Sequence, residues 1–74
     1  MQRIVFRLER DHVELNVLLK LVGLVDSGGA GKALVSSGTV QVDGEVELRR
    51  TCKIRAGQVV QVGDVRIAVA EAGA

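Results

Sequence analysis

The fold is decided by one stretch of the chain, residues 15–44, which reads LNVLLKLVGLVDSGGAGKALVSSGTVQVDG. Its first third carries apolar side chains at the i, i+3, i+4 and i+7 positions of one helix face, namely Leu15, Leu18, Leu19 and Val22. Gly23 follows, where the end of a helix favours a left-handed residue. We therefore predict a helix over residues 12–22, with Asp11 as its N-cap and Glu14 completing a capping box.

The junction Asp26-Ser27-Gly28-Gly29 predicts the start of a second helix, which ends at Gly38. Asp26 or Ser27 caps this helix, and its narrow apolar side consists of Ala30, Ala33 and Leu34. Each glycine near its start costs up to ~1 kcal/mol relative to alanine, at Gly28, Gly29 and Gly31. Two explanations remain open: close packing of the two helix backbones, or close approach of a ligand.

The segments on either side of this stretch predict β-strands. Residues 2–8 alternate polar and apolar, which places Ile4, Phe6 and Leu8 on one face of a strand. Further strands are expected after the helices, at about residues 52–55, 58–62 and 65–69.

A β-hairpin is predicted at Asp43-Gly44, a strong turn signal. A two-residue loop there would pair Val42 with Glu45 and place an acid on the core side of the sheet. A three-residue loop over 43–45 would instead pair Val42 with Val46. We favour the three-residue loop, which puts four residues on the core side, namely Val46, Leu48, Cys52 and Ile54.

Composition limits what the chain can do. Its 74 residues allow one domain, 1–74, and its net charge of +1 means that a nucleic-acid surface must arise from local grouping of cations. Phe6 is the sole aromatic residue, so platforms for stacking bases are lacking. Cys52 is the sole cysteine and His12 the sole histidine, so neither an internal disulfide nor a cysteine–histidine metal site is expected. We predict no catalytic residues, no metal and no cofactor, and therefore no enzyme.

Targeting segments are not recognisable in the sequence. The N-terminus lacks the continuous apolar core of a signal peptide, and no stretch has the length of a membrane span. We expect a soluble cytoplasmic protein without a membrane partner.

The order of these motifs resembles the S4-like RNA-binding domain. The matching residues begin with the helix Leu15–Leu19 and continue through Gly23-Leu24-Val25, Ser27, Lys32-Ala33, Gly38, Val40-Gln41-Val42-Asp43-Gly44 and Ala56-Gly57-Gln58-Val59-Val60. The N-terminal strand, Gly28-Gly29 and the basic run from Arg49 to Arg55 resemble the stand-alone bacterial group typified by YbcJ.

This resemblance implies an α+β fold in which a two-helix unit, the αL motif, packs against a small β-sheet with hairpins and an added N-terminal strand. The core motif would span about residues 12–62. The resemblance also implies a non-catalytic, ribosome-associated module for structured RNA of the ribosomal or transfer class. Many S4 domains carry arginine where this chain has Glu14 and Gly28.

The start of the second helix is the first candidate RNA contact. Ser27 and the free backbone amides of Gly28 and Gly29 could bind a phosphate, aided by Lys32 one turn later. The alternative is an ordinary capped turn with tight helix packing.

The second candidate is the basic run 49–55, whose cations are Arg49, Arg50, Lys53 and Arg55. Period-two geometry places Arg50 at a bend or sheet edge and the other three cations on one side. The run either contacts phosphates or forms a solvated strand face balanced by Glu45 and Glu47. The main role predicted for Asp43 and Gly44 is to form a turn. The resemblance also implies that they make a secondary RNA contact.

These observations favour a monomer that binds structured RNA mainly through the phosphate backbone, without DNA specificity. The alternative is a protein-interaction module of a ribonucleoprotein that has lost direct RNA binding.

Overall fold

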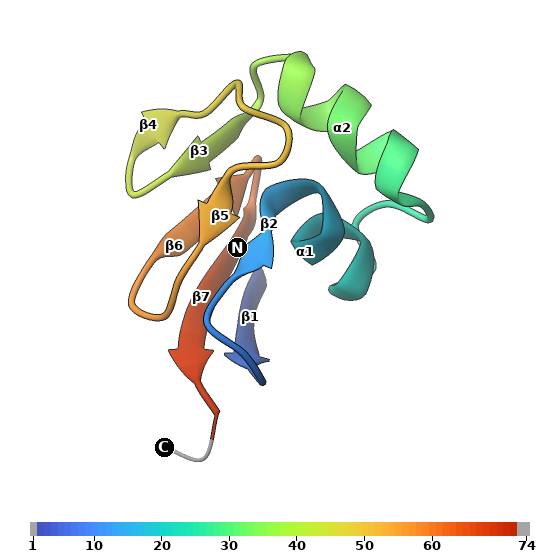
Figure 1. Ribbon diagram of the computed structural model, residues 1–74. Coiled ribbons are helices and arrows are strands. Elements are labelled where there is room, and N and C mark those ends of the chain that lie inside the picture. Colours follow the sequence, from blue (N-terminus) through green and yellow to red (C-terminus); the bar gives the residue numbers. More distant parts are fainter. Residues whose placement is uncertain (1, 73–74) are drawn as a thin grey trace.

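The computed structural model describes residues 2–72 and has the predicted α+β composition (Figure 1). Two helices interrupt a series of short strands. In chain order the elements are β1 (Gln2–Leu8), β2 (Val13–Glu14), α1 (Leu15–Leu21), α2 (Gly28–Ser36), β3 (Val40–Val42), β4 (Glu45–Val46), β5 (Lys53–Ile54), β6 (Val59–Val62) and β7 (Val65–Glu71).

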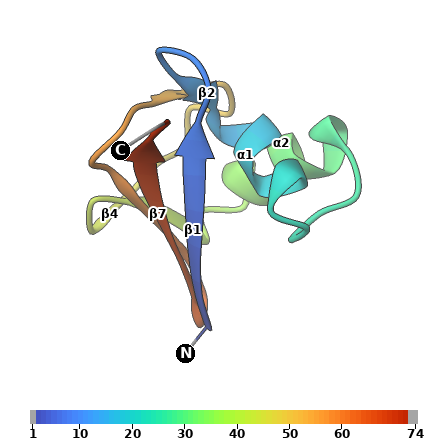
Figure 2. The same ribbon diagram turned by 90° about the horizontal axis from the view of Figure 1, so that it is seen from below.

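Five of the strands form one sheet in the order β1-β7-β6-β3-β4, and β2 and β5 form a separate antiparallel pair. The first and last strands of the described chain, β1 and β7, lie side by side in parallel, from Gln2 opposite Val65 to Leu8 opposite Glu71 (Figure 2). In Figure 1, α1 and the β2–β5 pair lie against one face of this sheet.

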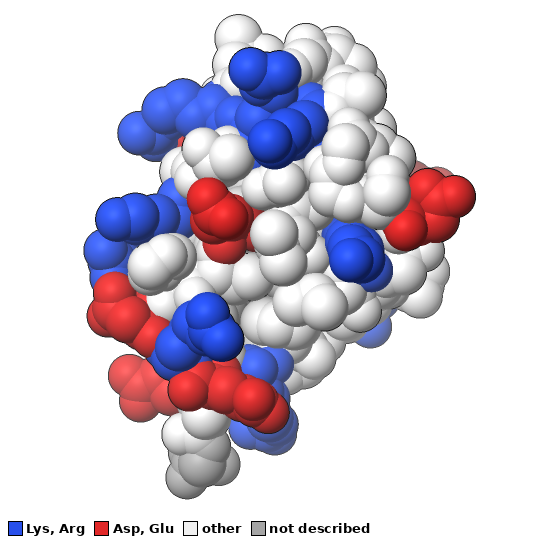
Figure 3. Space-filling view, turned by 45° about the vertical axis from the view of Figure 1, so that its right-hand side comes forward, with Lys and Arg blue, Asp and Glu red and all other residues white. Residues whose placement is uncertain are grey.

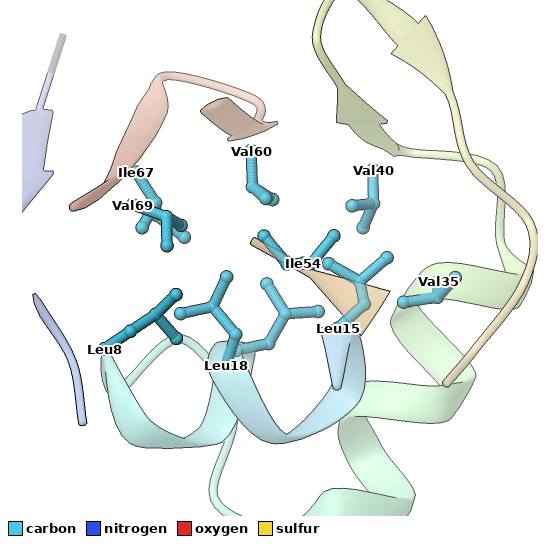
Figure 4. Close-up of a cluster of buried hydrophobic side chains, with 10 residues drawn as sticks. Leu8, Leu15, Leu18, Val35, Val40, Ile54, Val60, Ile67 and Val69 are labelled. Atoms are coloured by element: carbon cyan, nitrogen blue, oxygen red, sulfur yellow. The ribbon is translucent and has the colours of Figure 1, made fainter. Parts of the chain in front are cut away.

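The core fills the space between that face and α1 (Figure 4). Leu15, Leu18 and Leu19 are fully buried, as the i, i+3, i+4 spacing predicted. They meet side chains of the sheet and of β5, namely Val40, Val60, Ile67, Val69 and Ile54. Burial of each leucine contributes roughly 1.5–3 kcal/mol, so this aliphatic cluster stabilises the fold without aromatic residues.

The two helices are in backbone contact at Gly31. A Cβ atom built there would lie 2.5 Å from the carbonyl oxygen of Asn16 in α1, which is far inside van der Waals contact. Close packing therefore explains this glycine. Gly31 and Val35 are the buried residues of α2. Of the predicted apolar side, Leu34 packs against the core and Ala30 is half-buried, whereas Ala33 is exposed.

The predicted start of the first helix was wrong. α1 begins at Leu15, and Glu14 is its N-cap residue without a side-chain cap. Residues 13–14 instead pair with β5, and the Asp11 carboxylate pairs with Arg55 and lies 3.5 Å from His12 Nδ1. The first helical amides need no side-chain cap, because Leu15 N–H donates to the Cys52 carbonyl at 2.8 Å.

The favoured hairpin register was also wrong. Val42 lies opposite Glu45 and Gln41 opposite Val46, so the loop has two residues. Asp43 and Gly44 have φ values of 51° and 86°, and two successive positive values give the turn whose twist matches a β-hairpin. Turn geometry thus outweighed the apolar pairing, which leaves Val46 and Leu48 54% and 61% exposed.

Other expectations were confirmed. β1 has the predicted bounds, and its alternation places Leu8 in the core. Ser27 caps α2 by accepting a hydrogen bond from the Ala30 amide at 3.0 Å. Gly23 and Gly38 have the positive φ values expected beyond the two helix ends.

Candidate nucleic-acid interface

An open hollow of about 1060 Å³ lies between α2, the β3–β4 hairpin and the loop that joins β4 to β5. Its lining is rich in charged and polar side chains from segments far apart in the sequence. The residues that line it are Lys32, Val42, Asp43, Glu45, Val46, Glu47, Leu48, Arg49, Arg50, Thr51, Cys52, Lys53 and Gln58.

The hollow collects the cations of both predicted clusters. Lys32 comes from α2, Arg50 from the turn after β4, and Lys53 from β5. All three are exposed, and none makes an ion pair within residues 2–72. In Figure 3, Lys and Arg side chains gather at the upper end of the molecule, at the level of α2 and this loop.

Arg49 also lines the hollow, but it is paired. Its Nη2 lies 2.9 Å from Glu47 Oε1 and its Nε lies 2.9 Å from Glu47 Oε2, while its backbone N–H donates to the same carboxylate at 3.0 Å. These hydrogen bonds hold the pKa of Glu47 down to about 2 and raise that of Arg49. Arg49 therefore fits the alternative in which cations of the basic run are solvated and balanced by glutamates, because Glu47 already compensates its charge.

The loop that carries Arg50 is anchored to the helix pair. The amides at the start of α1 donate to its carbonyls, Leu15 N–H to Cys52 at 2.8 Å and Asn16 N–H to Arg50 at 3.1 Å. Arg50 lies in a turn, which agrees with the bend predicted because its position falls in the phase of the apolar residues. The backbone at Arg50 is thus fixed while its side chain stays exposed, which is a favourable arrangement for a binding group.

Asp43 and Gly44 act mainly as a turn. The Asp43 carboxylate accepts hydrogen bonds from the Val59 amide at 2.9 Å and from Gln58 Nε2 at 3.2 Å. These bonds fasten the hairpin to β6. Asp43 lines the hollow, so its negative charge also shapes the local electrostatics.

The predicted contact at the start of α2 lies elsewhere. Ser27, Gly28 and Gly29 do not line the hollow, and in Figure 1 this end of α2 points away from the hairpin. A Cβ atom at Gly29 would have only Ser27 Oγ nearby, at 3.9 Å, so packing does not explain this glycine. A role for the three residues in RNA contact stays a prediction.

The basic run is divided by the structure. Arg55 does not line the hollow and instead pairs with Asp11, which lowers the pKa of that carboxyl. Sequence reasoning missed two apolar side chains at the rim, Val46 and Leu48, because it placed both in the core. It also missed Gln58, for which no sequence signal existed beyond its position before a strand.

The described residues contain no group of three or more potential metal ligands. Burial raises the pKa of the Cys52 thiol, which disfavours the reactive thiolate. Within residues 2–72, no helix has the length and apolar character to cross a bilayer.

Comparison with known proteins identifies relatives of the chain. The family described as S4 domain matches residues 6–70. YbcJ of Escherichia coli strain K12, named as a candidate RNA-binding protein, is 55% identical over 49 residues, which are 66% of this chain and 70% of YbcJ. YbcJ of Shigella flexneri, named as uncharacterised, matches with the same identity and coverage.

A solved structure agrees with these matches. The solution structure of Escherichia coli YbcJ superposes with a TM-score of 0.69 at 45% identity, covering 89% of this chain and 85% of that one. That structure is described as revealing an αL motif involved in RNA binding. The similarity therefore extends over most of the fold, including the helix pair.

Proposed function

Because the chain belongs to the S4 domain family, we propose that it binds structured RNA through the hollow between α2, the β3–β4 hairpin and β5. Domains of this family bind RNA and are generally not enzymes, which supports a non-catalytic role. The described residues act as one RNA-binding unit, in which the helix pair and the loop position the cations.

One observation carries this proposal: three exposed cations without ion-pair partners, from three separate elements, converge on one hollow. Lys32, Arg50 and Lys53 are each able to contact a phosphate oxygen, and all belong to residues 2–72. If these side chains pointed in different directions, a single RNA segment could not engage them together. Their shared location supports a common polyanionic ligand.

The chemistry of the hollow favours recognition of shape and phosphate over base reading. No aromatic side chain lines it, so stacked bases have no platform. Glu45 and Asp43 at its border repel misplaced phosphates and restrict how a strand can lie. We propose folded RNA, of the ribosomal or transfer class, as the ligand of a cytoplasmic, ribosome-associated monomer.

The test is a titration of a folded RNA hairpin at several salt concentrations. For three phosphate contacts the log–log slope should be roughly −2 to −3. Arg50→Ala and Lys53→Ala should each reduce the slope by roughly 0.7–0.9. Lys20→Ala, at an exposed lysine of α1 outside the hollow, is the matched control and should leave the slope unchanged.

A slope that does not respond to Arg50 and Lys53 would contradict RNA binding at this hollow. The protein-interaction alternative would then be favoured, since Arg49 and Arg55 already show that carboxylates can satisfy cations of this run.

A further inference from the structure

The face of the five-stranded sheet that points away from α1 is a second surface without a structural role in the core. Figure 2 shows β1 and β7 side by side, and no helix crosses in front of either strand. The outward residues of these strands alternate with the buried ones, so they share one face. They are Arg3, Val5 and Arg7 of β1 and Arg66, Ala68 and Ala70 of β7.

The register places polar side chains in one row across this face. Arg3 lies opposite Arg66, Arg66 opposite Gln61, and Gln61 opposite Gln41. With strands ~4.8 Å apart, the row spans roughly 14 Å. Its next member is Val46, which also lines the hollow, so the row reaches the rim of the proposed RNA site.

The charge on this face is uncompensated. Its outward strand positions carry three arginines and no Asp or Glu, and within the described chain none of these arginines makes an ion pair. Removing these three from the ten Lys and Arg residues leaves seven cations against nine acids. The net positive charge of the chain therefore depends on this face.

Arg3 and Arg66 are like charges at partnered positions of the parallel β1–β7 ladder. Like charges directly opposite each other destabilise a sheet. In this fold, Arg3 and Arg66 face each other, and residues 2–72 place no carboxylate within ion-pair distance of either. An external anion would relieve this repulsion.

We infer that the uncovered sheet face is a second RNA contact, which lies along the wide, shallow minor groove of a double-helical segment of the RNA bound at the hollow. This inference rests on the proposed function. The arginines contact phosphate oxygens on the groove edges, and Gln61 and Gln41 hydrogen-bond to 2′-hydroxyl groups. Small side chains between them, Val5 and Ala68, let the sheet approach the groove closely.

The chemistry of the face favours RNA over a protein partner. Arginine serves both protein and RNA interfaces, but protein interfaces also depend on large aromatic anchors, tryptophan and tyrosine. Here the apolar outward residues are valines and alanines, and no aromatic side chain lies among the outward positions of the described strands. The row of arginine and glutamine, in contrast, matches the donors that contact nucleic-acid backbones.

The experiment measures binding of an RNA hairpin with a long stem across a salt series. The double variant Arg3→Gln/Arg66→Gln should lower the log–log slope by roughly 1.4–1.8. Its control is Lys20→Gln, at an exposed lysine of α1 outside the hollow and off the sheet, which should keep the slope. With a single-stranded RNA of the same length, the sheet-face variant and the wild-type chain should show the same salt slope.

Three outcomes are decisive. If the sheet-face variant keeps its slope while Arg50→Ala loses it, the second contact is refuted and the hollow stands. If the wild-type chain does not bind the hairpin, the proposed function fails as well. Amide NMR shifts on residues 66–70 of β7 upon RNA addition support the second contact, and their absence overturns it. Thermal melting of each variant confirms that the fold is intact.

Discussion

The helix pair and the rim of the hollow differ in how their side chains are used. The helix pair has a small residue for close packing, and the rim has exposed charged residues. At the helix pair, Gly31 lies so close to Asn16 that even a methyl group has no space. At the rim, the side chains of Arg50 and Lys53 are exposed, although the loop backbone is fixed to α1. The first region should therefore control stability, and the second should control binding.

The largest effect on stability is expected from the substitution Gly31→Ala. Alanine is the better helix former by ~1 kcal/mol, yet its Cβ atom would lie 2.5 Å from the Asn16 carbonyl oxygen. Overpacking of this kind costs roughly 1–3 kcal/mol of unfolding free energy. Urea unfolding should show a lower midpoint for this variant.

The matched control lies two residues earlier in the same helix. Gly29→Ala adds a Cβ atom with no contact closer than 3.9 Å, so it should hold or raise stability by up to about 1 kcal/mol. Equal midpoints for the two variants would contradict the packing explanation of Gly31.

The same two glycines show what the sequence could predict. Both lie near the start of a helix whose cap was predicted at Asp26 or Ser27 and is found at Ser27, because capping is a local property. Their different roles depend on how α1 and α2 cross, which no local pattern encodes. Likewise, the run 49–55 was recognised as basic, but its division between Glu47, Asp11 and the hollow follows from tertiary contacts.

In the β3–β4 hairpin, a local signal decided the register against the apolar pairing. Both registers were considered from the sequence, and the apolar one was favoured. The Asp43-Gly44 turn selected the other register, because two residues with positive φ close a two-residue loop regardless of which side chains then face solvent. Turn chemistry was therefore the stronger predictor, and the exposed Val46 and Leu48 became part of the rim.

The role of the rim in binding is tested by freeing the Arg49 guanidinium from its carboxylate partner. In Glu47→Gln the guanidinium loses its carboxylate partner and becomes available to a phosphate. RNA affinity should rise, and the salt slope should grow by roughly 0.7–0.9. Stability should fall by at most ~1 kcal/mol: the Arg49 side chain is 77% exposed, Glu47 is 16% exposed, and the glutamine keeps one oxygen to accept from the Arg49 amide.

Glu45→Gln is the control for that experiment. Glu45 lines the same hollow but has no ion-pair partner among residues 2–72, so its removal lowers repulsion without freeing a cation. Affinity should rise slightly while the slope stays close to that of the wild-type chain. If both variants change the slope equally, the Arg49–Glu47 pair does not limit binding.

The smallest effect on stability is expected from protonation of Glu47 at low pH. The pKa of Glu47 lies at about 2 in the folded chain and at 4.5 without its partners. A carboxyl with a lowered folded pKa stabilises the fold above its unfolded value and loses that contribution as the pH falls through the folded value. The pair should therefore persist through pH 4.5 and disappear only toward pH 2, with a small loss of stability across that window. NMR titration of the Glu47 side-chain carboxyl measures this directly: a midpoint near 4.5 would show that Arg49 is free at the rim, and would place it beside Arg50 and Lys53 as a binding cation.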